Sequence, residues 1–241
     1  MLLITVGFAF LWQRCEQRCQ AAGKTFYENK TNYLLLGISV LGTFLPMYLV
    51  NSCMSYVGND YINYYRYYQN IAAGREQDVD IAYKLINIFV IRAGLDFQWV
   101  YFITCFLAYG LLILCIWKYS KNYALSYLLF FFGGYFFLLG LNQIRQFVSM
   151  GMILWGIQYI QNRKFWKYLV CVCIAGLFHF TAFIMIPFYF ILNKKIKFSM
   201  YFVISMCALP INFFLTDILT FLFKTFCQDI CSRIIYLKHI L

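Results

Sequence analysis

Arg145 stands at the junction of two long apolar runs, in the stretch LGLNQIRQFVSMGM (139–152). An unpaired charge at the depth of a bilayer costs several kcal/mol, roughly 2.5 to 3.5 on insertion scales. A guanidinium is permanently charged and forks onto phosphate oxygens, so at the edge of a membrane it suits the diphosphate of a lipid carrier. The alternative is a side chain that only snorkels to lipid headgroups, because Arg145 lies at the end of a run.

Three other residues are candidates for proton transfer. Asp60 lies at the start of a tyrosine-rich segment, and His179 interrupts an apolar run. Asp80 ends a carboxylate cluster that also contains Glu76 and Asp78. A carboxylate or an imidazole accepts a proton from an attacking hydroxyl. The alternatives are that Asp60 only caps a helix and that His179 is a hydrogen-bonded structural residue.

Tyrosines recur with helical spacing in the same segment. At i, i+3, i+4 and i+7 they are Tyr61, Tyr64, Tyr65 and Tyr68, which places four rings on one helical face. Asn59 or Asp60 is the expected N-cap, and Gly74 the expected C-terminal stop. Such a face suits the apolar faces of sugar rings, with nearby carboxylates accepting hydrogen bonds from sugar hydroxyls. An aromatic belt at a membrane boundary is the alternative.

The composition indicates the solvent in which these residues must be positioned. Hydrophobic residues make up 63% of the chain, aromatic residues 22% and charged residues 12%, which is typical of a polytopic membrane protein. Lys and Arg lie in short loops between apolar runs, a pattern that argues against nucleic-acid binding. The ten cysteines are scattered, mostly inside apolar runs, and their spacing predicts no metal site.

Apolar runs of about 20 residues predict membrane-spanning helices. Besides the opening run, they cover residues 33–51, 97–117, 123–141, 144–160 and 198–223. Only helices or closed barrels satisfy the backbone in lipid, and an alternating strand pattern is absent. We therefore expect an all-α, polytopic transmembrane bundle, organised as a single integral membrane domain over residues 1–241.

Positive charges predict the orientation of this bundle. The basic loops at 14–30, 118–121, 163–167 and 194–197 should face the cytoplasm. The segment 52–81 then faces outward, and IAYKLINIFVIRAG (81–94) has the spacing of an interfacial helix.

The apolar run 168–192 has basic loops on both sides. Both loops lie inside only if the run enters and returns as two short halves, a broken or re-entrant helix pair with its bend at GLFHF (176–180) near the outer face. His179 then lies on the same side of the membrane as Arg145.

Four sequence blocks resemble the EpsG family in order and approximate spacing. They are VGNDYINYYRYY (57–68), DIAYKLIN (80–87), GLNQIRQFVSMGMIL (140–154) and CIAGLFHFTAFIMIPFYFI (173–191). This family comprises multi-pass membrane proteins of bacterial exopolysaccharide and capsule synthesis, regarded as similar to Wzy-type polysaccharide polymerases. The resemblance implies polymerisation of undecaprenyl-diphosphate-linked oligosaccharide repeats at the outer face of the cytoplasmic (inner) membrane. It implies no cofactor, since a cationic side chain can neutralise the leaving diphosphate.

The resemblance also assigns site residues. The family's Gly-x-Asp-Tyr, Arg-Gln and Phe-His patterns are matched by Gly58, Asp60 and Tyr61, by Arg145 and Gln146, and by Phe178 and His179. The predicted catalytic residues are Arg145, Asp60, His179 and Asp80. The predicted substrate-binding residues are Tyr61, Tyr64, Asn63, Gln146, Arg66 and Tyr83.

The chain departs from the family pattern at two places. Where the family usually shows Glu, a small or apolar residue, Gly and Tyr, this chain has Asp80, Ile81, Ala82 and Tyr83. Family members usually continue through further spans beyond CSRIIYLKHIL (231–241), so the resemblance predicts either the N-terminal portion of a longer domain or a divergent short member.

Two other functions are consistent with these residues. A non-catalytic membrane subunit of a polysaccharide assembly complex, with other assembly proteins as partners, needs the fold without the chemistry. A transporter of the lipid-linked sugar also needs a charged cavity, but it should show paired broken helices in corresponding halves. Only one interrupted run is present in the sequence.

Overall fold

The computed structural model describes residues 1–21, 30–55, 59–133, 137, 140, 142–193 and 206. Contacts divide the chain into Met1–Asn193 and Lys194–Leu241, and every described residue except Met206 belongs to the first unit. The span expected at 198–223 therefore lies outside the described residues, apart from Met206.

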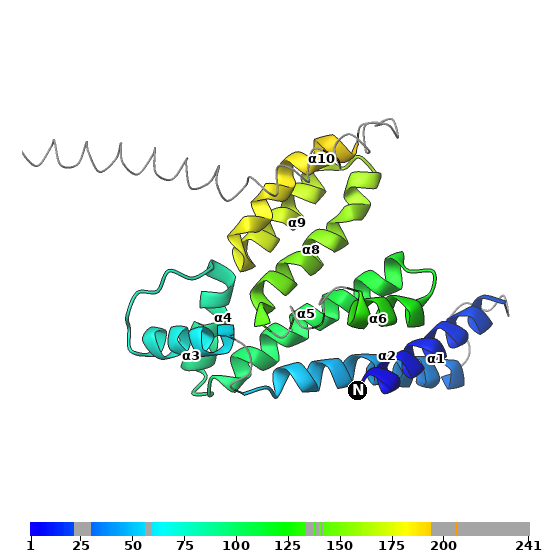
Figure 1. Ribbon diagram of the computed structural model, residues 1–241, viewed down its shortest axis with the longest axis horizontal. Coiled ribbons are helices and arrows are strands. Elements are labelled where there is room, and N and C mark those ends of the chain that lie inside the picture. The colour runs from blue at the N-terminus through cyan, green and yellow to red at the C-terminus, as the bar shows by residue number, and fades with distance from the viewer. Residues whose placement is uncertain are drawn as a thin grey trace, which may run out of the picture. The chain divides into compact units, whose positions relative to one another are not determined.

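All regular structure in the described residues is helical, so the predicted all-α class is confirmed there (Figure 1). In chain order the elements are α1 (Leu2–Ala21), α2 (Lys30–Ser52), α3 (Asn59–Ala72), α4 (Ile81–Arg92), α5 (Gln98–Tyr119), α6 (Tyr123–Phe132), α8 (Ile144–Gln161), α9 (Phe165–Phe178), the 3-10 helix η1 (Phe180–Met185) and α10 (Ile186–Leu192). Helix α5 is the central helix of the described residues, because it packs against α2, α4, α6 and α8.

Two of the described helices are long and apolar enough to cross a membrane. They are Leu34–Ser52 within α2, with mean hydropathy 1.8, and Gln98–Tyr119, with mean hydropathy 2.3. Large apolar side chains point outward from both, among them Leu41 at 55% and Phe106 at 57% exposure. A surface of this kind is stable in lipid or against another apolar surface.

The expected spans agree with the helices to different degrees. The runs 33–51, 97–117 and 144–160 coincide with helices α2, α5 and α8. Of these three helices, only α2 and α5 are long and apolar enough to cross a membrane. The span expected at 123–141 is not one continuous helix, because α6 ends at Phe132 with Gly133 as its C-cap. Glycine is the residue that most often follows the end of a helix.

Helix α3 begins two residues earlier than a cap at Asp60 requires. It starts at Asn59, which places both Asn59 and Asp60 in the first turn, so the expected N-cap at Asn59 or Asp60 was wrong. The expected stop at Gly74 is confirmed. Gly74 has a positive φ of 71°, and the following Arg75 N–H donates to the Asn70 carbonyl at 2.9 Å, which closes the helix end.

The tyrosine face of α3 docks on Phe97, at the start of α5. The rings of Tyr61, Tyr65 and Tyr68 lie 5.5, 5.3 and 5.7 Å from the Phe97 ring. The Tyr68 hydroxyl also donates to the Leu95 carbonyl at 2.7 Å. Helix α3 is thereby held against the connection between α4 and α5.

The interrupted run 168–192 folds back on itself. Helix α9 ends at Phe178, and His179 is extended, with φ −156° and ψ 111°. After η1 the chain returns along α9, so that the Tyr189 ring lies 5.6 Å from Tyr168 and 5.1 Å from Phe165 (Figure 1). The break therefore lies at the predicted bend, while its re-entrant placement in a membrane stays a prediction.

The ends of α1, α5 and α8 that were predicted to face the cytoplasm lie together. Lys118 donates to the Gln158 side chain, and Gln13 donates to the Lys121 carbonyl at 2.9 Å. Arg145 lies at the other end of α8, a helix of 18 residues, and therefore about 20 Å from Gln158 at 1.5 Å per residue.

Because Phe97 is 5% exposed and contacts several tyrosines, Phe97→Ala should destabilise the protein by about 3 to 5 kcal/mol, the usual cost of a buried Phe truncation. Phe106→Ala is the matched control, because Phe106 is mostly exposed. Unfolding in mixed micelles, followed by circular dichroism, measures both. Equal stability of the two variants would show that Phe97 does not anchor α3.

Candidate functional site

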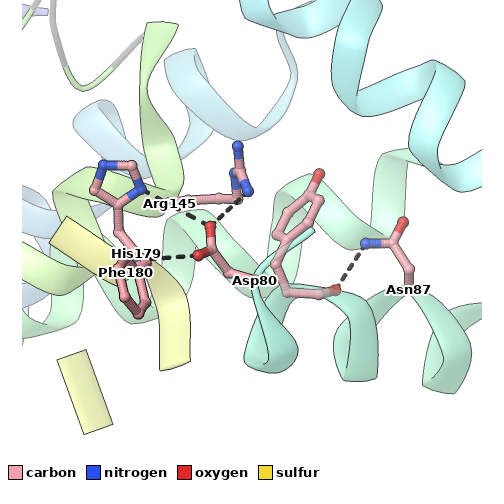
Figure 2. Close-up of polar contacts among 6 residues, drawn as sticks. Asp80, Asn87, Arg145, His179 and Phe180 are labelled. Carbon is pink, nitrogen blue, oxygen red and sulfur yellow. Dashed lines mark hydrogen bonds and ion pairs between the residues drawn. The ribbon is translucent and has the colours of Figure 1, made fainter. Parts of the chain in front are cut away.

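The carboxylate of Asp80 joins three segments that are distant in sequence. Asp80 is the N-cap residue of α4, yet its side chain makes no hydrogen bond to its own helix. Its Oδ2 accepts a hydrogen bond from Arg145 Nη1 at 2.6 Å, and its Oδ1 accepts one from the Phe180 N–H at 3.1 Å (Figure 2). Asp80 therefore holds the first turn of α8 and the start of η1 against α4.

His179 completes a polar cluster with Asp80 and Arg145. Its Nδ1 lies 3.8 Å from Asp80 Oδ2, beyond the usual hydrogen-bond distance. The side chains of Arg145, Asp80 and His179 are 19%, 15% and 29% exposed. In Figure 2 the imidazole and the guanidinium approach the Asp80 carboxylate from neighbouring directions. The extended backbone at the end of α9 is what brings His179 to this place.

Three tyrosine rings surround the Arg145 guanidinium. Its Cζ lies 5.3, 5.8 and 5.5 Å from the ring centroids of Tyr64, Tyr67 and Tyr83, within the range of a cation–π interaction. Tyr64 and Tyr83 are buried in the core. A single cation is thus held between one carboxylate and the rings of Tyr64, Tyr67 and Tyr83, which we call the aromatic floor.

The electrostatics keep this floor neutral. Burial raises the pKa of Tyr64 and of Tyr83, and the nearby Arg145 charge opposes the rise at both positions. The charge of Asp60 further raises the pKa of Tyr64. Both phenols therefore stay protonated at neutral pH. The Nε of Arg145 is buried and has no hydrogen-bond partner among the described residues. The side chain as a whole is 19% exposed, so a ligand reaches the guanidinium through its other nitrogens.

Asp60 reaches the site through the backbone. Its N–H donates to the side-chain oxygen of Asn142 at 3.2 Å, three residues before Arg145. The carboxylate of Asp60 is half-buried in the first turn of α3. A second carboxylate therefore lies on the element that also supplies Tyr64 and Tyr67.

The remaining predicted residues take different places. Tyr61 is 6% exposed, and its ring lies 5.3 Å from that of Tyr101, inside the core. Asn63 and Arg66 are exposed on α3, and Gln146 is half-buried beside Arg145 in α8. The structure brings together Arg145, Asp80, His179, Tyr64 and Tyr83, with Asp60 linked to them through Asn142.

Three contributors were not predicted from the sequence. Tyr67 lies three residues after Tyr64, and Asn142 lies in the same block as Arg145, so helical spacing and local proximity were the available signals. Phe180 contributes only its backbone N–H, which no side-chain pattern reveals.

This arrangement can do two kinds of chemistry. A permanently charged, partly exposed guanidinium can bind phosphate oxygens. A carboxylate or a neutral imidazole within the same site accepts a proton from a hydroxyl. Together they provide the two functions that a transfer from a diphosphate to a hydroxyl requires.

Comparison with known proteins agrees with the sequence blocks. The family model described as the EpsG family matches residues 26–236, a range that contains every residue of the site. The resemblance inferred from the sequence is therefore confirmed. Neither the curated proteins nor the solved structures contain a significant match to the chain.

The contact between Asp80 and Arg145 predicts energetic coupling. In a double-mutant cycle of Asp80→Ala and Arg145→Ala, the coupling should be about 1 to 3 kcal/mol of unfolding free energy, because the two side chains share a half-buried ion pair. A cycle of Arg145→Ala with Asp78→Ala is the matched control, since Asp78 is exposed, and should give less than about 0.5 kcal/mol. Equal coupling in both cycles would contradict the pair.

Proposed function

Because the chain belongs to the EpsG family, we propose that it is a multi-pass membrane polysaccharide polymerase of exopolysaccharide or capsule synthesis. In this proposal it joins undecaprenyl-diphosphate-linked oligosaccharide repeats at the outer face of the bacterial cytoplasmic membrane. The observation that carries the proposal is the Arg145 guanidinium, which is held between Asp80 and three tyrosine rings and stays partly exposed.

The position of the site along the helices supports an outer-face location. Helix α5 has 22 residues and is about 33 Å long at 1.5 Å per residue, close to the thickness of a bilayer's hydrocarbon core. Phe97 and Tyr101, at one end of α5, contact the tyrosines of α3, and Lys118 lies at the other end. With Lys118 on the cytoplasmic side, Arg145 lies at the level of the outer headgroups.

At that level Arg145 is suited to the diphosphate of the donor. The apolar carrier stays in the bilayer, and its diphosphate lies beside the exposed part of the guanidinium. When the glycan leaves the carrier, negative charge accumulates on the diphosphate, and a fixed cation stabilises this charge most strongly in a site with little water. Arg145 therefore supports both donor binding and departure of the leaving group.

The acceptor half of the reaction requires a proton acceptor. The acceptor hydroxyl oxygen bonds to the anomeric carbon of the donor glycan, while the bond between that carbon and the diphosphate oxygen breaks. The electron pair leaves with the diphosphate, and the hydroxyl proton passes to a base of the site. Both oxygens of Asp80 already accept hydrogen bonds, so Asp60 and His179 are the two candidates. Asn63 and Arg66, exposed on α3, are placed to contact sugar hydroxyls.

A strain that depends on this protein tests the proposal through its glycan profile. Arg145→Ala should abolish long polymer and accumulate single lipid-linked repeats, with linkage formation reduced at least about 100-fold, as when a transition-state donor is removed. Arg145→Lys keeps the charge but loses the paired N–H donors of the guanidinium, and it should give shorter glycan chains. Gels and lipid extracts, at matched membrane levels, measure both.

Arg92→Ala is the matched control, because Arg92 is exposed in the last turn of α4. It removes the same charge from the same predicted side of the membrane and should leave chain length unchanged. Normal polymer in the Arg145→Ala strain would refute the proposal and favour a non-catalytic assembly subunit. Lipid-linked repeats retained on the cytoplasmic side would instead indicate a transporter.

A further inference from the structure

Asp80 binds the Arg145 guanidinium, the group that the proposed function assigns to the substrate diphosphate. Its Oδ2 lies 2.6 Å from Arg145 Nη1, so the guanidinium already has an anionic partner. A diphosphate that binds Arg145 brings further negative charge next to this carboxylate. Like charges at such a distance repel each other strongly in a site with little water. Donor binding and the present position of Asp80 Oδ2 are therefore opposed.

A second partner for Asp80 lies close by. His179 Nδ1 is 3.8 Å from the same Oδ2, about 1 Å beyond the usual length of a hydrogen bond to a carboxylate. A small rotation of the carboxylate closes this gap. Oδ1 can keep its bond from the Phe180 N–H, at 3.1 Å, because Phe180 is the next residue after His179. No capping bond within α4 has to break, because the side chain makes none.

We propose that Asp80 is an exchangeable counter-ion, which an isoprenoid diphosphate displaces from Arg145 onto His179. This inference rests on the proposed function, since it deepens the role of the same site. Asp80 is a positioning residue in this scheme, and His179 is the catalytic base. Donor binding thereby prepares the base, because the released carboxylate fixes the imidazole with Nδ1 protonated and Nε2 available to the acceptor.

The transfer step then has a defined proton path. The acceptor oxygen bonds to the anomeric carbon, and its proton passes to His179 Nε2. The bond between the anomeric carbon and the diphosphate oxygen breaks, and the electron pair remains on the diphosphate beside Arg145. The imidazolium that forms is stabilised by Asp80, and it returns its proton to water after the carrier leaves. The ion pair of Asp80 with Arg145 then re-forms.

A purely structural role for Asp80 predicts the opposite change in affinity for the diphosphate. If Asp80 only holds Arg145 in place, Asp80→Asn misplaces the guanidinium and weakens diphosphate binding. If Asp80 competes with the diphosphate, Asp80→Asn removes the competitor and strengthens binding. The direction of the change thus separates the two roles.

The first experiment measures binding of farnesyl diphosphate to the purified full chain in detergent, by calorimetry. Asp80→Asn should bind about 3- to 30-fold more tightly than wild type, because less of the guanidinium is occupied by an internal anion. Asp78→Asn, the control for loss of one exposed carboxylate two residues away, should stay within about twofold of wild type. Arg145→Ala should lose at least about tenfold. Weaker binding by Asp80→Asn than by wild type would overturn the proposal.

A second experiment needs no substitution at Asp80 and therefore holds even where that variant does not fold. The chain has two histidines, His179 and His239, so His239→Gln leaves one imidazole signal in a histidine-labelled protein. Addition of farnesyl diphosphate should shift the Nδ1–H resonance of His179 downfield, as its bond to Asp80 forms, and Arg145→Ala should abolish the shift. Saturating binding with an unchanged His179 resonance would contradict the exchange.

The two proposals fail in different ways. If Arg145→Ala strains make normal polymer, the proposed function fails, whatever the binding results. A second outcome is that Arg145 is required for polymer, but Asp80→Asn does not raise the affinity for farnesyl diphosphate and the ligand does not shift the His179 resonance. In that case only the exchange fails. Turnover adds a check, because Asp80→Asn should bind more tightly and yet polymerise at least about tenfold more slowly for want of an oriented base.

Discussion

The site depends on one ion pair, between Arg145 and Asp80. An arginine near the end of an apolar helix is costly when it is unpaired, and pairing to a carboxylate at 2.6 Å offsets part of that cost. The pair also joins residues 65 positions apart. Besides this pair, the cation–π contact with Tyr83 links the Arg145 side chain to α4.

The aromatic residues of α3 make this pair possible. Tyr64 and Tyr67 form part of the floor under the guanidinium, and α3 is itself fixed by ring contacts to Phe97. A cation on an aromatic floor has low competition from water, so a single anion dominates its surroundings. In this structure the anion is Asp80, and in the proposed reaction it is the diphosphate. The same geometry is therefore compatible with both the observed ion pair and the proposed diphosphate site.

Periodicity and charge predicted much of this arrangement. Apolar run lengths identified the helices α2, α5 and α8, and Gly74 correctly marked the end of α3. The interruption at His179 followed from basic loops on both sides of one apolar run. These features are local, so a single sequence contains them.

The partners within the site did not follow from the sequence. Asp80 is an N-cap residue, and local rules favour a bond from its carboxylate to its own helix. The structure instead turns the carboxylate to Arg145 and to the Phe180 N–H, which is a choice made by tertiary packing. The burial of Tyr61, expected to contact sugar, depends likewise on the position of Phe97. Sequence spacing assigns a residue to a helical face, but tertiary packing determines which residues that face contacts.

The most direct test of catalysis by this chain is reconstitution. The purified protein, alone in liposomes with lipid-linked repeat units, should form longer glycans and release one undecaprenyl diphosphate for each new linkage. Polymer length and free carrier, measured on the same samples, give that ratio. Absence of elongation by the folded protein alone, with elongation restored only when another membrane protein is added, would show that the chemistry belongs to that partner.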